Sequence, residues 1–503
     1  MMKLRMRTAL LASAALLLGL ASCKSDRQEA ALQNGECDTY VGVSVRFPAP
    51  ETRALPDDHN KLDGEWQGRD VIKKIKVYVA TTSNGNTTIS SDQFTEANFG
   101  GINNGILAPN LAVEAKSGDK VKIYVVINDM AGKVTTILDE KANTPATFDA
   151  EFQKAVAMVA AIADVAKYDN EKDIVLMTNE TAPEDMTIAP NISKEDAIGG
   201  KANRVEVKVS RVASRAIATV DDKVVKTIDI KRTFTDAKGN TSESTTATVT
   251  VKDIMYQVTG SALQFNVLED RTDWKVAAPV YGFTPASKDW TALATEAKDK
   301  MIFTDAEGYK AALVKANNEL ASVKEALGAE TFSKFVLPVT HAKGNYKKGN
   351  TTMFEIKATF TVDKIDGVAP TSTDAQTVYL GLSDGKFYST KEKAEAMDAA
   401  LTGTDYEKKQ SAKEYTNGEM YYYIWLNPDV DYSDTTKTIS ESPTVRNQVY
   451  HAHITGFGEM GVADKDEINP DEDLETKKTH LSVQLRVLPW TIHSYTVNLV
   501  NRY

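Results

Sequence analysis

The sequence predicts a mainly β protein of two domains, with a few helices packed against its sheets. Many short segments place Val, Ile or Tyr at every second position, which is the period of a half-buried strand. Stretches rich in Asn and Gly separate these segments, as hairpins and loops require. With 503 residues, the chain has a natural length for two domains.

The first 22 residues have the composition of a signal peptide. Lys3, Arg5 and Arg7 precede an apolar stretch at residues 9–20, which is too short to span a bilayer. Small residues then lead to Cys23, where a lipoprotein signal peptidase can cut. We therefore expect residues 1–22 to be removed and Cys23 to carry acyl chains such as palmitate. The alternative is an ordinary secretory signal followed by an incidental cysteine.

The next elements are expected strands and helices, taken in chain order. The strands are predicted at residues 41–47, 71–80, 120–128, 204–211 and 247–264. The helices are predicted at residues 150–167, 291–300, 307–327 and 391–401. So few helices are expected to decorate sheets and not to form a bundle.

A domain boundary is expected near residue 270. Residues 235–244 are polar and poor in strand formers, and residues 269–275 are charged. This division gives an N-terminal domain at residues 54–270 and a C-terminal domain at residues 271–503. The acidic stretch at residues 464–475 is predicted to be a solvated loop before the last strands.

Composition and charge narrow the classes of partner and chemistry. A net charge of −11 without a long basic run argues against nucleic acid or anionic lipid as a partner of the folded body. Cys23 and Cys37 are the only cysteines, so the body has no disulfide framework. Its stability is expected to come from burial and hydrogen bonding.

The first expected strand is placed where proteolysis can remove it. Its residues Val41, Val43, Val45 and Phe47 alternate with small or polar residues, which predicts a strand with one face in a core. The proline-rich stretch at residues 48–54 follows, and it offers a trypsin-like protease an accessible cut after its arginine. Cutting there would release the strand as part of a propeptide, residues 23–53.

The C-terminal end of the sequence supplies a second alternating segment. This expected donor strand is carried by Trp490, Ile492, Tyr495, Val497 and Leu499. A sheet edge in one subunit could accept this strand from the next subunit, as in donor-strand complementation, and head-to-tail addition of this kind builds a filament. The alternative is that the first strand simply belongs to a stable monomer.

The C-terminal half resembles a known family, the Bacteroidales fimbrillins. More narrowly, it is similar to the stalk subunit of the short, or minor, fimbria of the Porphyromonas type, one of the type V pili. The resemblance spans most of the chain and is most specific in the C-terminal half. The motifs that carry it lie at residues 346–352 (YKKGNTT), 380–382 (LGL), 385–388 (GKFY), 421–428 (YYYIWLNP), 446–450 (RNQVY) and 489–495 (PWTIHSY).

The resemblance implies a fold, a maturation step and a set of partners. The fold would be two transthyretin-like β-sandwiches in tandem, the first with an acceptor groove. The lipid on Cys23 would bring the precursor to the outer membrane, and an arginine-specific protease would cut between Arg53 and Ala54. Mature subunits would form a homopolymer at the cell surface, with accessory tip and anchor subunits. No role follows for Cys37.

Other motifs do not support catalysis or a cofactor. His451 and His453 would lie on one face of a strand as a metal half-site, but no third ligand or known metal motif joins them. The aromatic run at residues 421–425 is interpreted as core packing in preference to a sugar-binding surface. Motifs for nucleophilic catalysis, phosphate binding or dinucleotide binding are absent from the sequence. We expect no enzyme, no cofactor and no metal.

Two functional hypotheses remain open. The first is a structural pilin whose polymer forms the shaft of a surface fimbria and supports adhesion to host or bacterial receptors, co-aggregation, biofilm formation and virulence. The second is a surface lipoprotein that does not polymerise, such as a tip or anchor adhesin or a glycan-binding protein.

Overall fold

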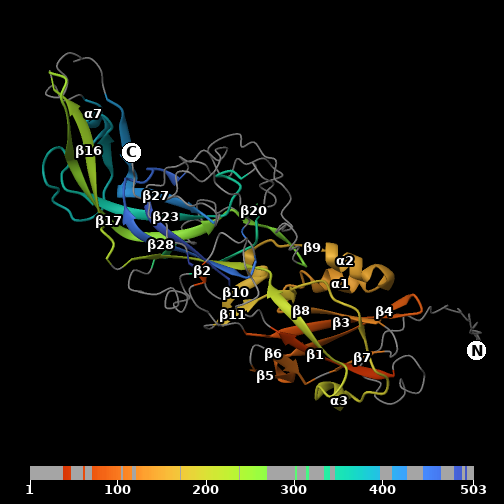
Figure 1. The fold of residues 1–503 in the computed structure, drawn as a ribbon. Helices are drawn as coiled ribbons and strands as arrows, with labels where there is room; N and C mark the ends of the chain where they lie inside the picture. The colour runs from red at the N-terminus through yellow and green to blue at the C-terminus, as the bar shows by residue number, and fades with distance from the viewer. Residues whose placement is uncertain are drawn as a thin grey trace, which may run out of the picture.

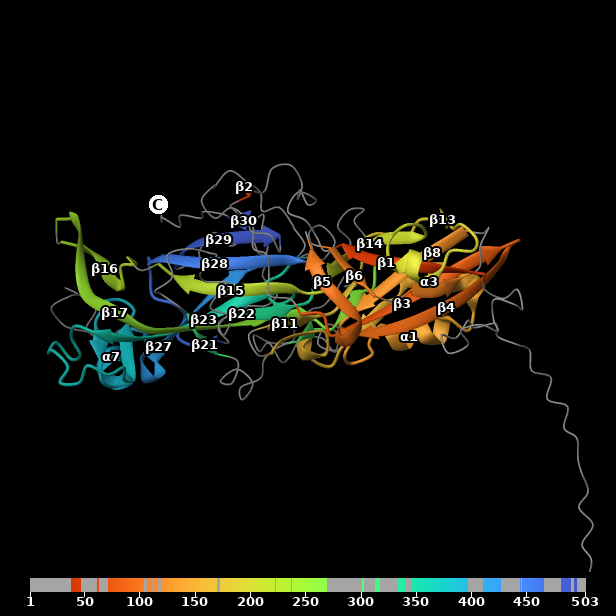
Figure 2. The same cartoon turned by 90° about the horizontal axis from the view of Figure 1, so that it is seen from below.

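The structure is a computed structural model with side chains. It describes residues 38–46, 61–62, 71–268 apart from short gaps at 104–105, 111, 116–119, 170–171, 222 and 237, and then 301–302, 313–316, 333–339, 346–396, 410–426, 444, 446–465, 481–489 and 493–494. The described chain is mainly strand, so the predicted fold class is confirmed. Figure 1 and Figure 2 show an elongated molecule with two β-rich ends.

The N-terminal part is built on one large sheet. Its strand order is β4-β3-β8-β12-β14-β1-β6-β5, with β13 paired to β8 and β7 paired to β1. The strands are β1 (Thr39–Arg46), β3 (Lys74–Ser83), β4 (Asn86–Thr95), β5 (Phe99–Asn103), β6 (Ile106–Pro109), β7 (Ala112–Ala115), β8 (Lys120–Ile127), β12 (Met177–Asn179), β13 (Met186–Thr187) and β14 (Arg204–Arg211). The expected strands at residues 120–128 and 204–211 are thus present as β8 and β14.

Both faces of this sheet are covered in its centre. Along β3, Val77 and Val79 join a core that also holds the valines of β1, while Tyr78 and Ala80 join a second core on the opposite face. The helices α1 (Thr135–Lys141) and α2 (Phe148–Lys154) cover the second core, and α3 (Lys194–Ile198) lies against β1 and β7. The sheet therefore folds around the first core, which lies between its own strands. The helices α1 and α2 cover the second core on its opposite face.

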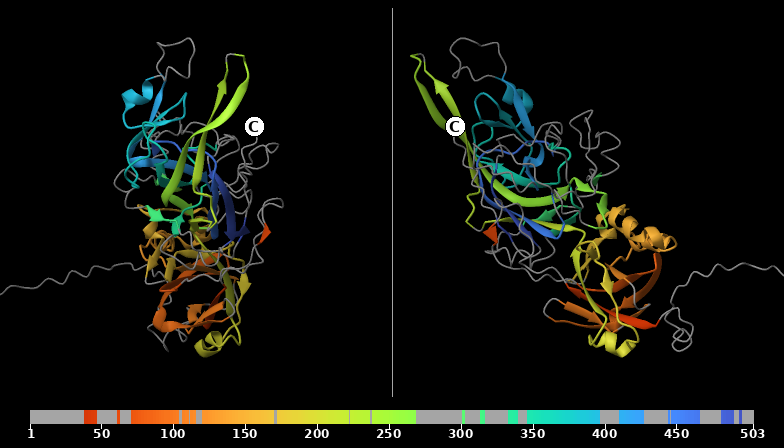
Figure 3. Two further views of the ribbon diagram at one scale, coloured as in Figure 1. Left: turned by 90° about the vertical axis from the view of Figure 1, so that its left-hand side faces the viewer. Right: turned by 45° about the vertical axis from the view of Figure 1, so that its right-hand side comes forward.

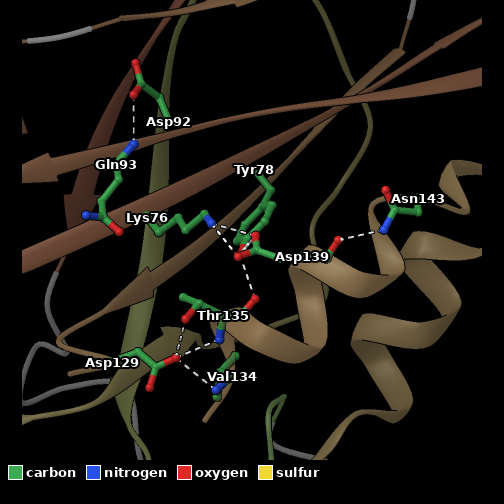
Figure 4. A network of polar contacts seen from close by, with 9 residues as sticks. All are labelled: Lys76, Tyr78, Asp92, Gln93, Asp129, Val134, Thr135, Asp139 and Asn143. Atoms are coloured by element: carbon green, nitrogen blue, oxygen red, sulfur yellow. Dashed lines mark hydrogen bonds and ion pairs between the residues drawn. The ribbon is translucent and has the colours of Figure 1, made fainter. Parts of the chain in front are cut away.

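The helix α1 is held by a network of polar contacts, which Figure 4 shows from close by. The buried Asp129 carboxylate accepts hydrogen bonds from the backbone N–H groups of Val134 and Thr135 at 2.9 and 2.6 Å, which satisfies the first turn of the helix. At the other end of the helix, Asp139 accepts from the Tyr78 hydroxyl at 2.8 Å and pairs with Lys76. Burial, followed by the Asp139 charge, raises the pKa of the Tyr78 hydroxyl. The network fixes α1 to β3.

The C-terminal part is a sandwich of two sheets. One has the order β22-β15-β28-β29 and the other β16-β17-β23-β27, with β21 paired to β17. These strands are β15 (Ser214–Val220), β16 (Thr227–Thr235), β17 (Thr241–Thr259), β21 (Val314–Lys315), β22 (Ser333–Val336), β23 (Met353–Val362), β27 (Glu419–Trp425), β28 (Gln448–Phe457) and β29 (Leu481–Pro489). Their inward-facing residues form one core that holds residues of β15, β17, β23, β27 and β28.

Smaller elements complete the fold. The short α7 (Lys391–Glu395) packs on a small sheet at the end of the C-terminal part that lies away from the N-terminal part, where the ribbon β16–β17 also projects (Figure 3). That sheet consists of β24 (Val378–Gly381), β25 (Phe387–Tyr388) and β26 (Ala412–Tyr415). The remaining strand pairs are β2 (Lys61–Leu62) with β30 (His493–Ser494), β9 (Val156–Met158) with β19 (Gln264–Asn266), β10 (Ala166–Asp169) with β11 (Lys172–Val175), and β18 (Ser261–Ala262) with β20 (Met301–Ile302). Short 3₁₀ turns lie at Glu96–Asn98, Pro145–Thr147, Ile162–Asp164 and Thr416–Gly418.

The helix expected at residues 150–167 is too long. The helix α2 ends at Lys154, and β9 follows at once because it pairs with β19 more than a hundred positions further along the chain. Of the helix expected at residues 307–327, the described residues 313–316 contain the strand β21, so that prediction is wrong there. The helix expected from residue 391 does begin there, as α7. The helix expected at residues 291–300 lies outside the described residues, and so does the loop expected at residues 464–475 apart from its first two residues.

Strand pairing changes partners well before residue 270. The strand β15 pairs with β28 in parallel, and β17 pairs with β23, so three strands upstream of the expected boundary belong to the C-terminal sheets. The change of sheet lies between β14 and β15, where Val212 and Ala213 are fully buried in the second core. That core also contains Leu337 and Val449, so apolar packing runs continuously from one part of the molecule to the other.

Candidate functional site around β1

The first strand is an interior strand of the N-terminal sheet. Residues 42–46 of β1 pair in parallel with residues 204–208 of β14. On its other side β1 pairs antiparallel with β7, along residues 39–42, and then with β6, at residues 45–46. The main-chain groups of β1 therefore bond to neighbours on both sides over most of its length.

One face of β1 is embedded in the core. Val41 and Val45 are 0% exposed and Val43 is 2% exposed, so the alternation seen in the sequence does place one face of a strand in a core. Each fully buried valine contributes about 1.5–3 kcal/mol relative to an exposed one. Phe47, the fourth residue of the predicted strand, lies outside the described residues. Whether this strand is removed stays a prediction.

The other face of β1 is covered by a segment that we call the strap, residues 189–203, which contains α3. Asn203 donates from Nδ2 to the carbonyl oxygen of Tyr40 at 3.2 Å and to the Thr39 hydroxyl at 3.0 Å. The backbone N–H of Tyr40 donates to the carbonyl oxygen of Ile192 at 3.2 Å. The helix itself begins at a Ser193 cap and places the fully buried Ala197 over the strand.

The exit of β1 is fixed by an ion pair. Arg46 donates from Nη2 to Glu206 Oε2 at 2.8 Å and from Nε to the other carboxylate oxygen. Both side chains are 37% exposed, so this bidentate pair contributes modestly to stability. Arg46 is thus a paired residue within a ladder, and residues 47–60 separate it from β2.

Most of the other predicted site residues lie outside the described residues. These are Cys23, Arg53 and Ala54 at the N-terminal end and Trp490, Ile492, Tyr495, Val497 and Leu499 at the C-terminal end. Within the expected donor segment the structure describes β30, whose His493 and Ser494 pair antiparallel with Leu62 and Lys61 of β2. The strands β2 and β30, which are far apart in the sequence, thus lie side by side, as Figure 2 also shows.

Three comparisons relate this chain to known proteins. The model of the family described as major fimbrial subunit protein type IV, fimbrillin, C-terminal, matches residues 413–496. The minor fimbrium subunit Mfa1 of Porphyromonas gingivalis is 28% identical over 519 residues, which cover 97% of this chain and 98% of that protein.

The chain is a member of the Bacteroidales fimbrillin family.

Solved structures similar to this chain include a cell adhesion protein and a fimbrial protein. A putative cell adhesion protein from Parabacteroides distasonis is 12% identical with a TM-score of 0.43, over 90% of this chain and 99% of that chain. The tip fimbrial protein Mfa3 from Porphyromonas gingivalis, with C-terminal truncation, is 11% identical with a TM-score of 0.34, over 89% of this chain and 99% of that chain.

His451 and His453 lie on one face of β28, as their spacing predicts. Thr219 of β15 places its hydroxyl 2.7 Å from His451 Nε2 and 2.7 Å from His453 Nδ1. His453 Nε2 lies 3.2 Å from the Asp221 carboxylate. These contacts link two neighbouring parallel strands. Among the described residues, no group of three or more His, Cys, Asp or Glu side chains is placed to hold a metal ion.

The aromatic run of β27 is part of the interior. Tyr422 and Ile424 face the main C-terminal core, while Tyr423 and Trp425 lie in a small cluster on the other face. Trp425 Nε1 donates to the carbonyl oxygen of Lys348 at 2.9 Å. Since these four side chains are at most 8% exposed, they form no open platform for a sugar ring.

Sequence reasoning missed a group of buried arginines between the two β-rich parts. Arg215 of β15 donates from Nη2 to Asp173 of β11 at 2.6 Å, and both side chains are 0% exposed. Arg446 donates from Nη2 to the hydroxyls of Thr178 and Ser210, each at 3.0 Å. The motif at residues 446–450 contains Arg446 and could have signalled a buried arginine. Its partners, Thr178 and Ser210, lie more than two hundred positions away in the sequence. These contacts tie the C-terminal part of the molecule to the N-terminal part.

Within the part of the chain that the structure describes, no helix is both long and apolar enough to cross a membrane.

Proposed function

We propose that this fimbrillin is the structural stalk subunit of a cell-surface fimbria and that it polymerises by protease-gated strand exchange. The precursor is a lipoprotein acylated at Cys23 and held at the outer membrane. An arginine-specific protease cuts between Arg53 and Ala54, and β1 leaves with the propeptide. The C-terminal segment of another copy, with Trp490, Ile492, Tyr495, Val497 and Leu499, then fills the acceptor groove, which is the space of β1 between β14 and β6–β7.

One observation carries this proposal: β1, the strand that precedes the expected cut, is an interior strand of its sheet. Loss of an edge strand would only make the sheet narrower. Loss of β1 would remove the hydrogen-bonding partner of β14 on one side and of β6 and β7 on the other. It also exposes the core that Val41, Val43 and Val45 complete. The three valines together contribute roughly 5–9 kcal/mol of burial, so the cleaved subunit gains strongly from taking up another strand.

The charge and the relatives are consistent with the same role. Removal of residues 1–53 makes the net charge more negative, from −11 to −13, and removes both cysteines, so the mature subunit would join its neighbours without disulfide bonds. The relatives of nearly full coverage carry the name of a minor fimbrium subunit. Accessory tip and anchor subunits, and host or bacterial receptors, are the proposed partners. Adhesion, co-aggregation and biofilm formation follow from the shaft, whose role is structural and not catalytic.

The position of the cut is tested by two matched arginine variants. Arg53→Ala should accumulate lipidated precursor and abolish fimbriae, because the propeptide then stays attached. Arg46→Ala should mature normally, because the backbone around Arg46 is paired with β14 and is not free to enter the active site of a protease. N-terminal sequencing and intact mass of the protein sheared from cells measure both. Normal fimbriae from Arg53→Ala, or arrest by Arg46→Ala alone, would contradict the assigned cut.

A further inference from the structure

The outer face of β1 passes the strap at a distance that only glycine allows. A Cβ atom placed on Gly42 would lie 2.1 Å from the carbonyl oxygen of Ala197 and 2.7 Å from its carbonyl carbon. Real Cβ contacts are never this short, and both neighbouring atoms belong to the backbone of α3. Rotation of a side chain therefore cannot relieve the contact.

The strap makes its main-chain contacts at this same point of β1. The backbone N–H of Gly42 donates to the carbonyl oxygen of Asn203 at 3.0 Å, and that of Asn191 donates to the carbonyl oxygen of Asp38 at 3.1 Å. The Thr39 hydroxyl donates to the carbonyl oxygen of Ala189 at 2.8 Å. Both ends of the strap thus contact Asp38 and the first half of β1, residues 39–42.

The expected donor segment has no residue that could take the place of Gly42. Residues 490–503 read WTIHSYTVNLVNRY and contain no glycine. With Tyr495, Val497 and Leu499 on the core positions of β1, the position of Gly42 falls to Thr496 in one strand direction and to Asn498 in the other. Every other register also places a Cβ atom there.

We propose that Gly42 is the residue that allows the chain's own strand, and no donor strand, to lie beneath α3 in its closed position. This inference rests on the proposed strand exchange. A donor that fills the whole acceptor groove must displace the strap, so the strap is closed in the precursor and open in the polymer. The strap must then open when the precursor is converted into an assembled subunit.

Hydrogen exchange measured by mass spectrometry tests this in fimbriae and in full-length Arg53→Ala precursor. The backbone N–H groups of Ala197 and Gly199 bond to the carbonyl oxygens of Ser193 and Glu195 within the closed strap. We expect peptides that cover α3 to exchange about tenfold faster or more in fimbriae than in precursor. Peptides that cover β14 and β6 should stay equally slow in both, because a strand occupies the groove in both.

The outcomes separate this inference from the proposed function. Slow exchange in α3 together with slow exchange in β14 and β6 of fimbriae would overturn the role of Gly42 and leave strand exchange standing. Fast exchange in β14 and β6 of fimbriae would mean that no strand fills the groove, and both proposals would fall.

A variant of the precursor supplies an independent test. Gly42→Ala places a Cβ atom beneath Ala197, so α3 should exchange about tenfold faster without any cleavage. Ser44→Ala is the matched control on the same face of β1, where Ser44 is 6% exposed, and it should leave α3 unchanged. Unchanged exchange in Gly42→Ala would overturn the inference. If Gly42→Ala does not fold, as fast exchange in β3 and β8 would reveal, the comparison of fimbriae with precursor decides alone.

Discussion

At the scale of single residues, the fimbrillin joins its helices to its sheet through carboxylates. Asp149 of α2 accepts from Lys122 Nζ at 2.6 Å and from the Tyr124 hydroxyl at 2.9 Å, both on β8. Partial burial alone would raise the pKa of the Asp149 carboxyl, but the hydrogen bonds from Lys122, Tyr124 and Gln153 outweigh it and lower the pKa below its usual value. The phenol rings add edge contacts, since Tyr124 lies 4.8 Å from the ring of Phe152.

The lowered pKa of Asp149 predicts a pH-dependent contribution to stability. A carboxyl with a depressed pKa in the folded state stabilises fully above its unfolded value of 3.8, and the contribution is lost as the pH falls through the lower folded value. Asp149→Asn should therefore lower the free energy of unfolding by about 1 kcal/mol at pH 7. The difference from wild type should shrink as the pH falls below 3.8 and through the lower folded value. Urea unfolding of both precursors at pH 7 and at a pH well below 3.8 measures it, and an equal difference at both would contradict the assignment.

At the scale of elements, the sequence predicts strands whose two faces carry different kinds of side chain. The alternation of β1 and β14 is visible because their outward positions are polar or small. In β15 every residue of Ser214–Val220 is buried, so no alternation signals the strand, and its parallel partner β28 lies more than two hundred positions away. Likewise the end of α2 depends on the distant β19. The close approach of Ala197 to Gly42 leaves no trace in local sequence at all.

The elements that join the two parts depend on a buried ion pair. The side chains of Arg215 and Asp173 are both 0% exposed. Removing Arg215 therefore leaves the Asp173 carboxylate buried without the charge of this arginine. Arg215→Met should therefore cost about 3–5 kcal/mol, and adding Asp173→Leu should recover much of it. Lys231→Met breaks the exposed pair with Glu243 as a matched control and should cost less than about 1 kcal/mol. Urea midpoints of the precursor report all three, and a cost for Arg215→Met as small as the control would contradict the role of the pair.

At the scale of the whole molecule, the fold class and the strand at residues 39–46 could be predicted from alternation, while the site around it could not. The sequence places four apolar residues before an arginine, but the parallel pairing with β14 shows why losing this strand matters. The polar and apolar contacts between the two β-rich parts join them into one stiff unit. In the proposed shaft, load would pass through the groove of each subunit.

A structure of sheared fimbriae by electron cryomicroscopy tests the central claim most directly. The account predicts that the density between β14 and β6–β7 belongs to residues 490–503 of a neighbouring copy, and that each subunit begins at Ala54. Density there for Val41, Val43 and Val45 of the same chain would contradict strand exchange.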